Sequence, residues 1–205
     1  MLSLRRINNN KIILLLLPLF ISFSSGGQEI DERYDEIVIR NRIFKPYSGY
    51  ITISTGPSYN PGLGSMEKAF SLGYHFRIKD YHFHTGYHVT SDKFFMNRSY
   101  QMMSDIYLLC GYRKETIKSN INISGGPVYG FGSTLDSVHD INGTRTNYYL
   151  YFHKIGLYTE AEYTYKLTYD FGIGLSAYVS ANKAYQVAGL KIHLYFSGAY
   201  KGSIE

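Results

Sequence analysis

Hydrophobic and polar residues alternate along the chain between residues 69 and 90. On both sides of Lys79-Asp80, every second residue is aromatic or aliphatic, beginning with Phe70, Leu72, Tyr74 and Phe76. The residues between them are histidine, arginine, serine or glycine. A period of two places the two sets on opposite faces of a β-strand. Two such strands joined by two polar residues predict a β-hairpin that turns at Lys79-Asp80.

The same alternation recurs and predicts eight strands. They cover residues 47–55, 69–78, 81–90, 100–113, 119–131, 147–162, 167–179 and 186–196. Short turns are expected at 79–80, 114–118 and about 164–166, and longer loops at 56–67, 91–99, 132–146 and 180–184. The sequence shows no clear helix that would cover the apolar face of such a sheet. We therefore expect an all-β, antiparallel up-and-down barrel whose apolar face contacts lipid.

The pattern from Tyr47 to about Phe196 resembles that of the small outer-membrane β-barrels of the OmpA-transmembrane, OmpX and OmpW type. The resemblance rests on the strand pattern and not on a specific motif. It implies an eight-stranded transmembrane barrel with short periplasmic turns and longer external loops. It also implies that the partners are outer-membrane lipid and lipopolysaccharide, with other envelope proteins reached through the N-terminal arm or the external loops.

The N-terminus has the pattern of a signal peptide. Basic residues Arg5, Arg6 and Lys11 precede the apolar segment 12–23, which is too short to span a bilayer as a helix. Small residues follow, and cleavage is expected after Gly27. We therefore expect export through a signal peptide of residues 1–27 and a final location in the bacterial outer membrane. The remaining chain divides into an N-terminal periplasmic arm or short plug (28–46), the barrel (47–200) and a C-terminal tail (201–205).

Composition narrows the class of protein further. The chain has 21 basic and 16 acidic residues, and removal of the three in the signal leaves 18 against 16. A net charge of about +2 gives no case for nucleic acid. The chain has 22 tyrosines and no tryptophan, and the amphipathic ring of tyrosine suits the headgroup level of a membrane. The single cysteine, Cys110, excludes an intrachain disulfide.

The polar face of the predicted strands points into the barrel. An eight-stranded barrel is just wide enough inside for side chains to fill it, and buried charges need partners of opposite sign. We therefore expect a plugged interior and not an open pore. The predicted polar network comprises His75, Arg77, His82, His84, His88, Asp105, Arg113, Lys154, Glu160, Glu162, Asp170, Lys191 and His193. The predicted lipid-facing residues are Phe70, Leu72, Tyr74, Phe76, Phe171, Ile173, Leu175, Leu190, Ile192 and Leu194.

Two histidines are weak candidates for a metal site. If Lys79-Asp80 closes a two-residue turn, His75 lies opposite His84, with Cβ atoms roughly 4.5–5.5 Å apart. Two neutral imidazoles at that distance could bind zinc or copper if a carboxylate such as Asp105 or Glu160 completed the site. The favoured interpretation is a hydrogen-bonded polar filling, with no metal and no cofactor.

Three other functions stay open beside a structural, adhesive or accessory role in the envelope. A lipid-modifying enzyme of the deacylase type would carry His-x-Ser on a strand, whereas this chain has His88-Val89-Thr90; no catalytic residue is predicted. A small porin would need an open lumen. A soluble lipocalin-like carrier would place the aromatic face inside, and its usual Gly-x-Trp cannot occur in a chain without tryptophan.

Overall fold

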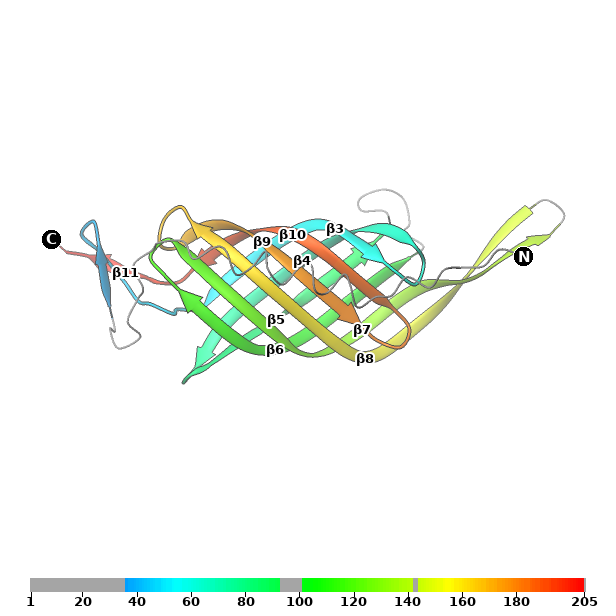
Figure 1. The fold of residues 1–205 in the computed structure, drawn as a ribbon, viewed down its shortest axis with the longest axis horizontal. Helices are drawn as coiled ribbons and strands as arrows, with labels where there is room; N and C mark the ends of the chain where they lie inside the picture. Colours follow the sequence, from blue (N-terminus) through cyan, green and yellow to red (C-terminus); the bar gives the residue numbers. More distant parts are fainter. Residues whose placement is uncertain (1–35, 93–100, 142–143, 205) are drawn as a thin grey trace, which may run out of the picture.

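The computed structural model describes residues 36–92, 101–141 and 144–204, with side chains described outside residues 135–147. The predicted signal peptide and most of the expected loop 91–99 lie outside these ranges. In the described ranges the chain is all-β, and no helix there is long and apolar enough to cross a membrane. Eight strands close into an antiparallel barrel in the order β10-β3-β4-β5-β6-β7-β8-β9 (Figure 1). They are β3 (Tyr50–Asn60), β4 (Ser65–Ile78), β5 (Tyr81–Ser91), β6 (Met102–Glu115), β7 (Ser119–Ile141), β8 (Thr144–Lys166), β9 (Phe171–Ala181) and β10 (Gln186–Ser197).

The hairpin predicted around Lys79-Asp80 is confirmed. Ile78 pairs with Tyr81 and His75 pairs with His84, as a two-residue turn requires. Lys79 has a φ of 55°, the left-handed conformation that hairpin turns of this length use.

The prediction of a loop at 56–67 is wrong. β3 continues to Asn60 and β4 begins at Ser65, so only residues 61–64 turn. The glycine and proline that suggested a loop lie within β3, where the ladder to β10 skips Gly56 and Pro57. Proline has no N–H to donate there. A Cβ at Gly56 would lie 2.0 Å from the Leu190 carbonyl oxygen, so glycine permits this close approach.

The prediction of a long loop at 132–146 is also wrong. β7 and β8 each run for 23 residues and pair with each other as far as Ile141 and Thr144. β6 pairs with β7 only up to Ser133, and β9 pairs with β8 only from Leu157. The far ends of β7 and β8 therefore extend beyond the barrel as a two-stranded hairpin, drawn at the right of Figure 1.

A small second sheet lies at the opposite end of the barrel, where the short turns are (Figure 1). It contains β1 (Ile37–Ile39), β2 (Arg42–Phe44) and β11 (Tyr200–Ser203), in the order β1-β2-β11. Phe44 and Ala199 are buried in a small apolar cluster with Tyr169, which lies in the turn after β8. Part of the expected arm or plug and part of the expected tail thus form one cap on the barrel end.

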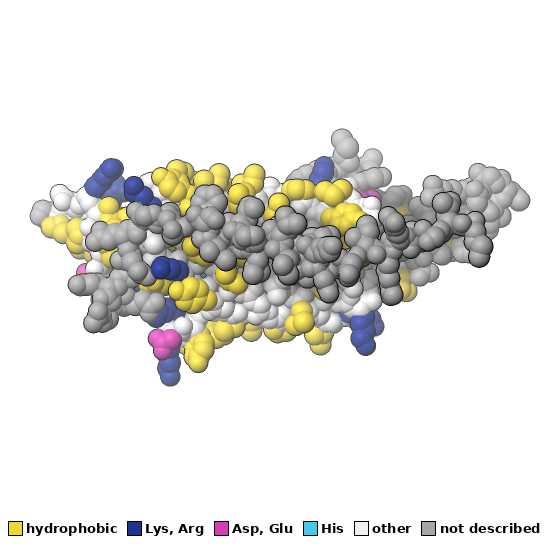
Figure 2. Space-filling view, viewed as in Figure 1, with side chains coloured by type: hydrophobic (Ala, Val, Ile, Leu, Met, Phe, Trp, Pro, Cys, Tyr) yellow, Lys and Arg dark blue, Asp and Glu magenta, His cyan; other side chains and the backbone are white. Residues whose placement is uncertain are grey.

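Burial alternates along the barrel strands as the sequence pattern predicts. Leu72, Ile173 and Leu190 are 47%, 44% and 60% exposed, and Figure 2 shows hydrophobic side chains along the barrel wall with lysines and arginines toward its ends. Of the predicted lipid-facing residues, eight are exposed and Phe76 and Phe171 are half-buried. Within the barrel body, the alternate positions point inward and bury histidine, serine and asparagine side chains together with charged residues such as Glu160 and Lys191. A lipocalin-like carrier has the reverse arrangement, so that alternative is wrong.

Candidate functional site: the polar lumen

One buried ion pair spans the inner face of β9. Lys191 on β10 places Nζ 2.7 Å from Oε1 of Glu160 on β8, and both side chains are at most 2% exposed. The same ammonium group donates to Ser71 Oγ at 2.9 Å and to Tyr158 OH at 3.1 Å. All three ammonium protons thus have acceptors, which a buried lysine requires.

A second charged cluster lies where β6 and β8 meet the cap. Arg113 Nη2 donates to Glu115 Oε2 at 2.9 Å, and Lys166 Nζ donates to the other oxygen of Glu115. The backbone N–H of Tyr47 also donates to Glu115 Oε2, at 2.8 Å. This cluster therefore ties the chain segment that enters β3 to the barrel wall.

Three histidines of the β4–β5 hairpin, His75, His82 and His84, form a compact group. The rings of His75 and His84 stack with centroids 3.7 Å apart and planes inclined by 20°. His75 Nδ1 lies 3.4 Å from His82 Nε2, and Tyr50 stacks on the other face of His75 at 4.0 Å. All three histidines are buried.

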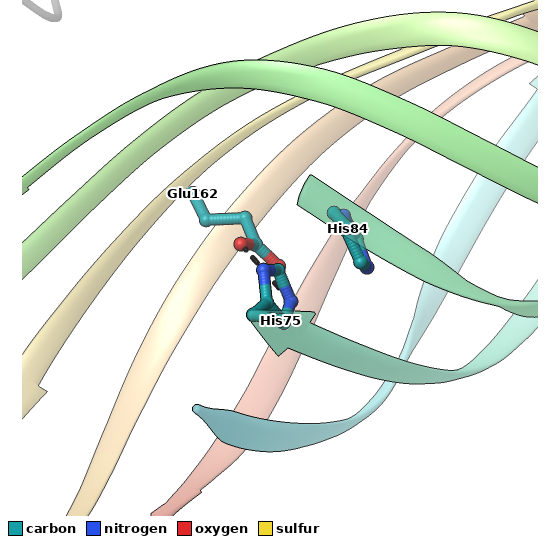
Figure 3. Close-up of side chains that lie close together, drawn as sticks. All are labelled: His75, His84 and Glu162. Atoms are coloured by element: carbon teal, nitrogen blue, oxygen red, sulfur yellow. Dashed lines mark ion pairs between the residues drawn. The ribbon is translucent and has the colours of Figure 1, made fainter. Parts of the chain in front are cut away.

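The carboxylate beside this pair is Glu162, and the expectation of Asp105 or Glu160 is wrong. Figure 3 shows Glu162 of β8 and His75 of β4 pointing toward each other, with His84 of β5 beside them. Glu162 Oε2 lies 3.6 Å from His75 Nε2 and accepts from Asn122 Nδ2 at 2.9 Å. One ligand atom from each of His75, His84 and Glu162 can be chosen so that all three lie within 4.8 Å of one another.

Other members of the predicted network are also inside the lumen. His88 accepts or donates one hydrogen bond with Ser71 Oγ at 2.7 Å, and His193 Nε2 lies 2.8 Å from Thr164 Oγ1. Asp105 is buried and accepts from Ser180 Oγ at 2.8 Å.

Three residues predicted for the network lie elsewhere. Lys154 is exposed, because it precedes Leu157, the first residue of β8 that pairs with β9. Asp170 is half-buried in the turn before β9, where it accepts from Thr168 Oγ1 at 2.9 Å. Arg77 lies at the mouth of the barrel, with a side chain 25% exposed and 3.6 Å from Asp80.

Sequence reasoning missed a hydrogen-bonded group at the other end of the lumen. Glu67 is buried and accepts from Asn60 Nδ2 at 3.2 Å, from Gln101 Nε2 at 2.6 Å and from the Tyr185 hydroxyl. Burial, and then the neighbouring Glu67, raise the pKa of Tyr185, so its hydroxyl remains a donor. The glycine- and proline-rich composition of 56–67 predicts a loop, which hides the inward position that Glu67 has in β4.

The lumen also holds a serine–histidine pair that the sequence did not reveal. Ser71 and His88 have the separation of a nucleophile and its base, but both are at most 2% exposed. Lys191 donates to the same serine oxygen. Thr90 of His88-Val89-Thr90 is fully buried as well. An acyl substrate outside the barrel therefore has no access to this pair.

No protein-family profile and no curated protein matches the sequence. Among solved structures, Neisserial surface protein A matches with a TM-score of 0.53 at 14% identity over 73% of this chain and 96% of that chain. Ail, the attachment invasion locus protein of Yersinia pestis, matches with a TM-score of 0.46 at 15% identity over 75% and 95% of the two chains. The N-terminal β-barrel domain of Pseudomonas aeruginosa OprF has a TM-score of 0.43 at 12% identity over 72% and 97%. The chain therefore has the fold of the small eight-stranded outer-membrane β-barrels, which Neisserial surface protein A shares.

Proposed function

We propose that the chain is an integral protein of the bacterial outer membrane with a filled, non-conducting barrel. The observation that carries this proposal is the exposed apolar wall around a charged interior. A soluble monomer rarely exposes contiguous apolar surface of more than a few hundred Å², whereas Leu72, Leu175 and Leu190 on three different strands are 47–62% exposed. In a bilayer this wall would be buried in hydrocarbon, and the closed ladder would leave no strand edge in lipid.

Fractionation tests this location. The native protein, produced in a Gram-negative host, should sediment with outer membranes and resist alkaline carbonate. It should also migrate differently on gels before and after boiling. Recovery as a soluble periplasmic protein would contradict the proposal.

Within this location, we propose an adhesive or accessory role for the protruding β7–β8 hairpin. Its described outer part exposes Tyr148, Leu150 and Tyr151 by 49%, 54% and 80%. Exposed aromatic residues are typical of binding surfaces. Among the described strands, β7 pairs with β6 only as far as Ser133, and β8 pairs with β9 only from Leu157 onward. The outer edge of each hairpin strand can therefore add a strand from a partner.

A shortened hairpin tests this role. Replacing residues 135–149 by a two-residue Asn-Gly turn, together with Leu150→Thr and Tyr151→Thr, removes the exposed apolar residues of the hairpin. The barrel should stay folded and inserted, because residues 135–149 pair in the strand ladder only with each other. Attachment of expressing cells to immobilised host-matrix proteins, or co-purification of an envelope complex, should fall. If both properties are unchanged, the hairpin has no such role.

A further inference from the structure

The buried charges of the lumen do not balance. Among the residues that the structure describes, the fully buried carboxylates are Glu67, Asp105, Glu115, Glu160 and Glu162, and the buried cations are Arg113, Lys166 and Lys191. Lys191 pairs with Glu160, while Arg113 and Lys166 share Glu115. Glu162 has only the imidazole of His75 within ion-pair distance. An isolated buried carboxylate is costly, so this position favours a protonated carboxyl or an additional cation.

The group around Glu162 is rich in metal-binding donors. Its carboxylate, His75 and His84 bring one oxygen and two nitrogen donors within 4.8 Å of one another. A third imidazole, His82, contacts His75 at 3.4 Å. His82 and His84 each have a buried Nδ1 without a hydrogen-bond partner. Neutral imidazoles and a carboxylate are the donor set of many zinc and copper sites.

We propose that His75, His84 and Glu162 bind one divalent transition-metal ion, of the zinc or copper class, inside the barrel. The ion would supply the positive charge that Glu162 lacks. This binding site is independent of the role of the β7–β8 hairpin, because it lies within the barrel body.

Coordination requires a local rearrangement. Donors around a tetrahedral zinc ion lie about 3.3–3.5 Å apart, which is closer than the 4.8 Å span of the three ligand atoms. The rings of His75 and His84 stack, so at least one must rotate for both nitrogens to point at the same ion. Gly73 leaves room beside His84: a Cβ there would lie 2.5 Å from His84 Nε2.

A cavity at the mouth with the short turns reaches the edge of this group at His82. This cavity of about 60 Å³ is lined by Tyr47, Arg77, Asp80, His82, Gly111, Tyr112 and Arg113. This volume holds a few water molecules. His82 is both in the cavity wall and in contact with His75. Two arginines face the entrance, but Arg77 pairs with Asp80 and Arg113 with Glu115, which lowers the repulsion toward a cation.

Zinc titration of the purified, folded full-length mature barrel tests the proposal, with competition against a chromophoric chelator. We expect one equivalent to bind. We expect His75→Gln, His84→Gln and Glu162→Gln each to weaken binding by more than the roughly 10–100-fold that loss of an outer-shell partner costs. Cobalt substitution should give the visible absorption of a tetrahedral site with imidazole ligands.

Two further variants serve as controls. His153→Gln removes an exposed histidine of β8, and His88→Gln removes a buried one that belongs to the Ser71 hydrogen bond. Both should keep full zinc binding. The gel shift on boiling verifies that each variant is folded, and the near-isosteric Glu162→Gln keeps the test valid if a histidine variant fails to fold. Absence of stoichiometric binding by the native barrel, or equal loss in His153→Gln, would overturn the proposal.

Discussion

Lys191 and Glu160 form a 2.7 Å ion pair although their strands, β10 and β8, are separated by β9. The pair therefore spans the inner face of β9 and does not join two neighbouring strands. Together with the Arg113–Glu115–Lys166 cluster, it fills the interior with paired charges. Filling of this kind is what an eight-stranded barrel has room for.

Breaking this pair from one side should destabilise the barrel strongly. Glu160→Ala leaves the Lys191 ammonium buried without its carboxylate, and such changes cost about 3–5 kcal/mol. The combined change Glu160→Leu with Lys191→Met should recover much of the loss, because both charges are removed. Denaturant unfolding in detergent micelles, followed by gel mobility, measures both effects.

The exposed pair between Lys201 and Glu36, at 3.1 Å, is the control for that experiment. Glu36→Ala should change the free energy of unfolding by less than about 1 kcal/mol. If Glu160→Ala costs no more than Glu36→Ala, the buried pair does not contribute as argued.

A charge on the barrel wall should impair insertion according to its depth. Leu175 lies near the middle of β9 and is 62% exposed, so Leu175→Arg should cost roughly 2–4 kcal/mol in a bilayer. Leu167, in the turn before β9, is similarly exposed, and Leu167→Arg should cost only about 0–1 kcal/mol near the interface. Folding into liposomes at graded denaturant measures the difference. Equal, small costs would mean that this face does not meet hydrocarbon.

The inward glycines should tolerate no added methyl group. A Cβ at Gly174 would lie 2.2 Å from the Tyr163 carbonyl oxygen and 2.4 Å from His193 Nε2. Gly174→Ala should therefore destabilise the barrel by about 1–3 kcal/mol through overpacking. Gly202→Ala in β11, where no atom lies within 4 Å of the added Cβ, should have little effect. Similar unfolding midpoints for the two variants would contradict a tightly filled lumen.

The filled lumen should also prevent conduction. Purified barrel in planar bilayers should give no steady ionic current, because buried side chains, among them Lys191 and Arg113, fill the interior. Large, stable single-channel steps would contradict this prediction and favour the porin alternative.

Strand alternation predicted the barrel and the faces of its strands, because a period of two reports directly on which side chains share a face. The register of His75 and His84 followed from one two-residue turn. Strand ends were harder to predict. Gly56 and Pro57 have the composition of a loop but lie inside β3, since tertiary pairing can outweigh local preference.

Contacts between distant strands could not be predicted at all. Strand alternation places Glu162 inside the barrel, but its position beside His75 depends on strands β4 and β8 lying on opposite sides of the lumen. Lys154 occupies an alternate position that the pattern predicts to face inward, but it is exposed. The reason is that β8 extends at this end beyond the paired part of β9. The strand pattern gives the face of a residue, whereas its surroundings depend on how far each neighbouring strand extends.

The native Cys110 allows the most direct test of the central claim that the apolar wall meets lipid. It is the only cysteine of the chain and lies exposed on β6. A nitroxide attached to Cys110 in the barrel folded into liposomes should collide readily with oxygen and rarely with a water-soluble nickel complex, as expected in hydrocarbon. Frequent collision with the nickel complex and low access to oxygen would show that this face contacts water, and would contradict the membrane-spanning barrel.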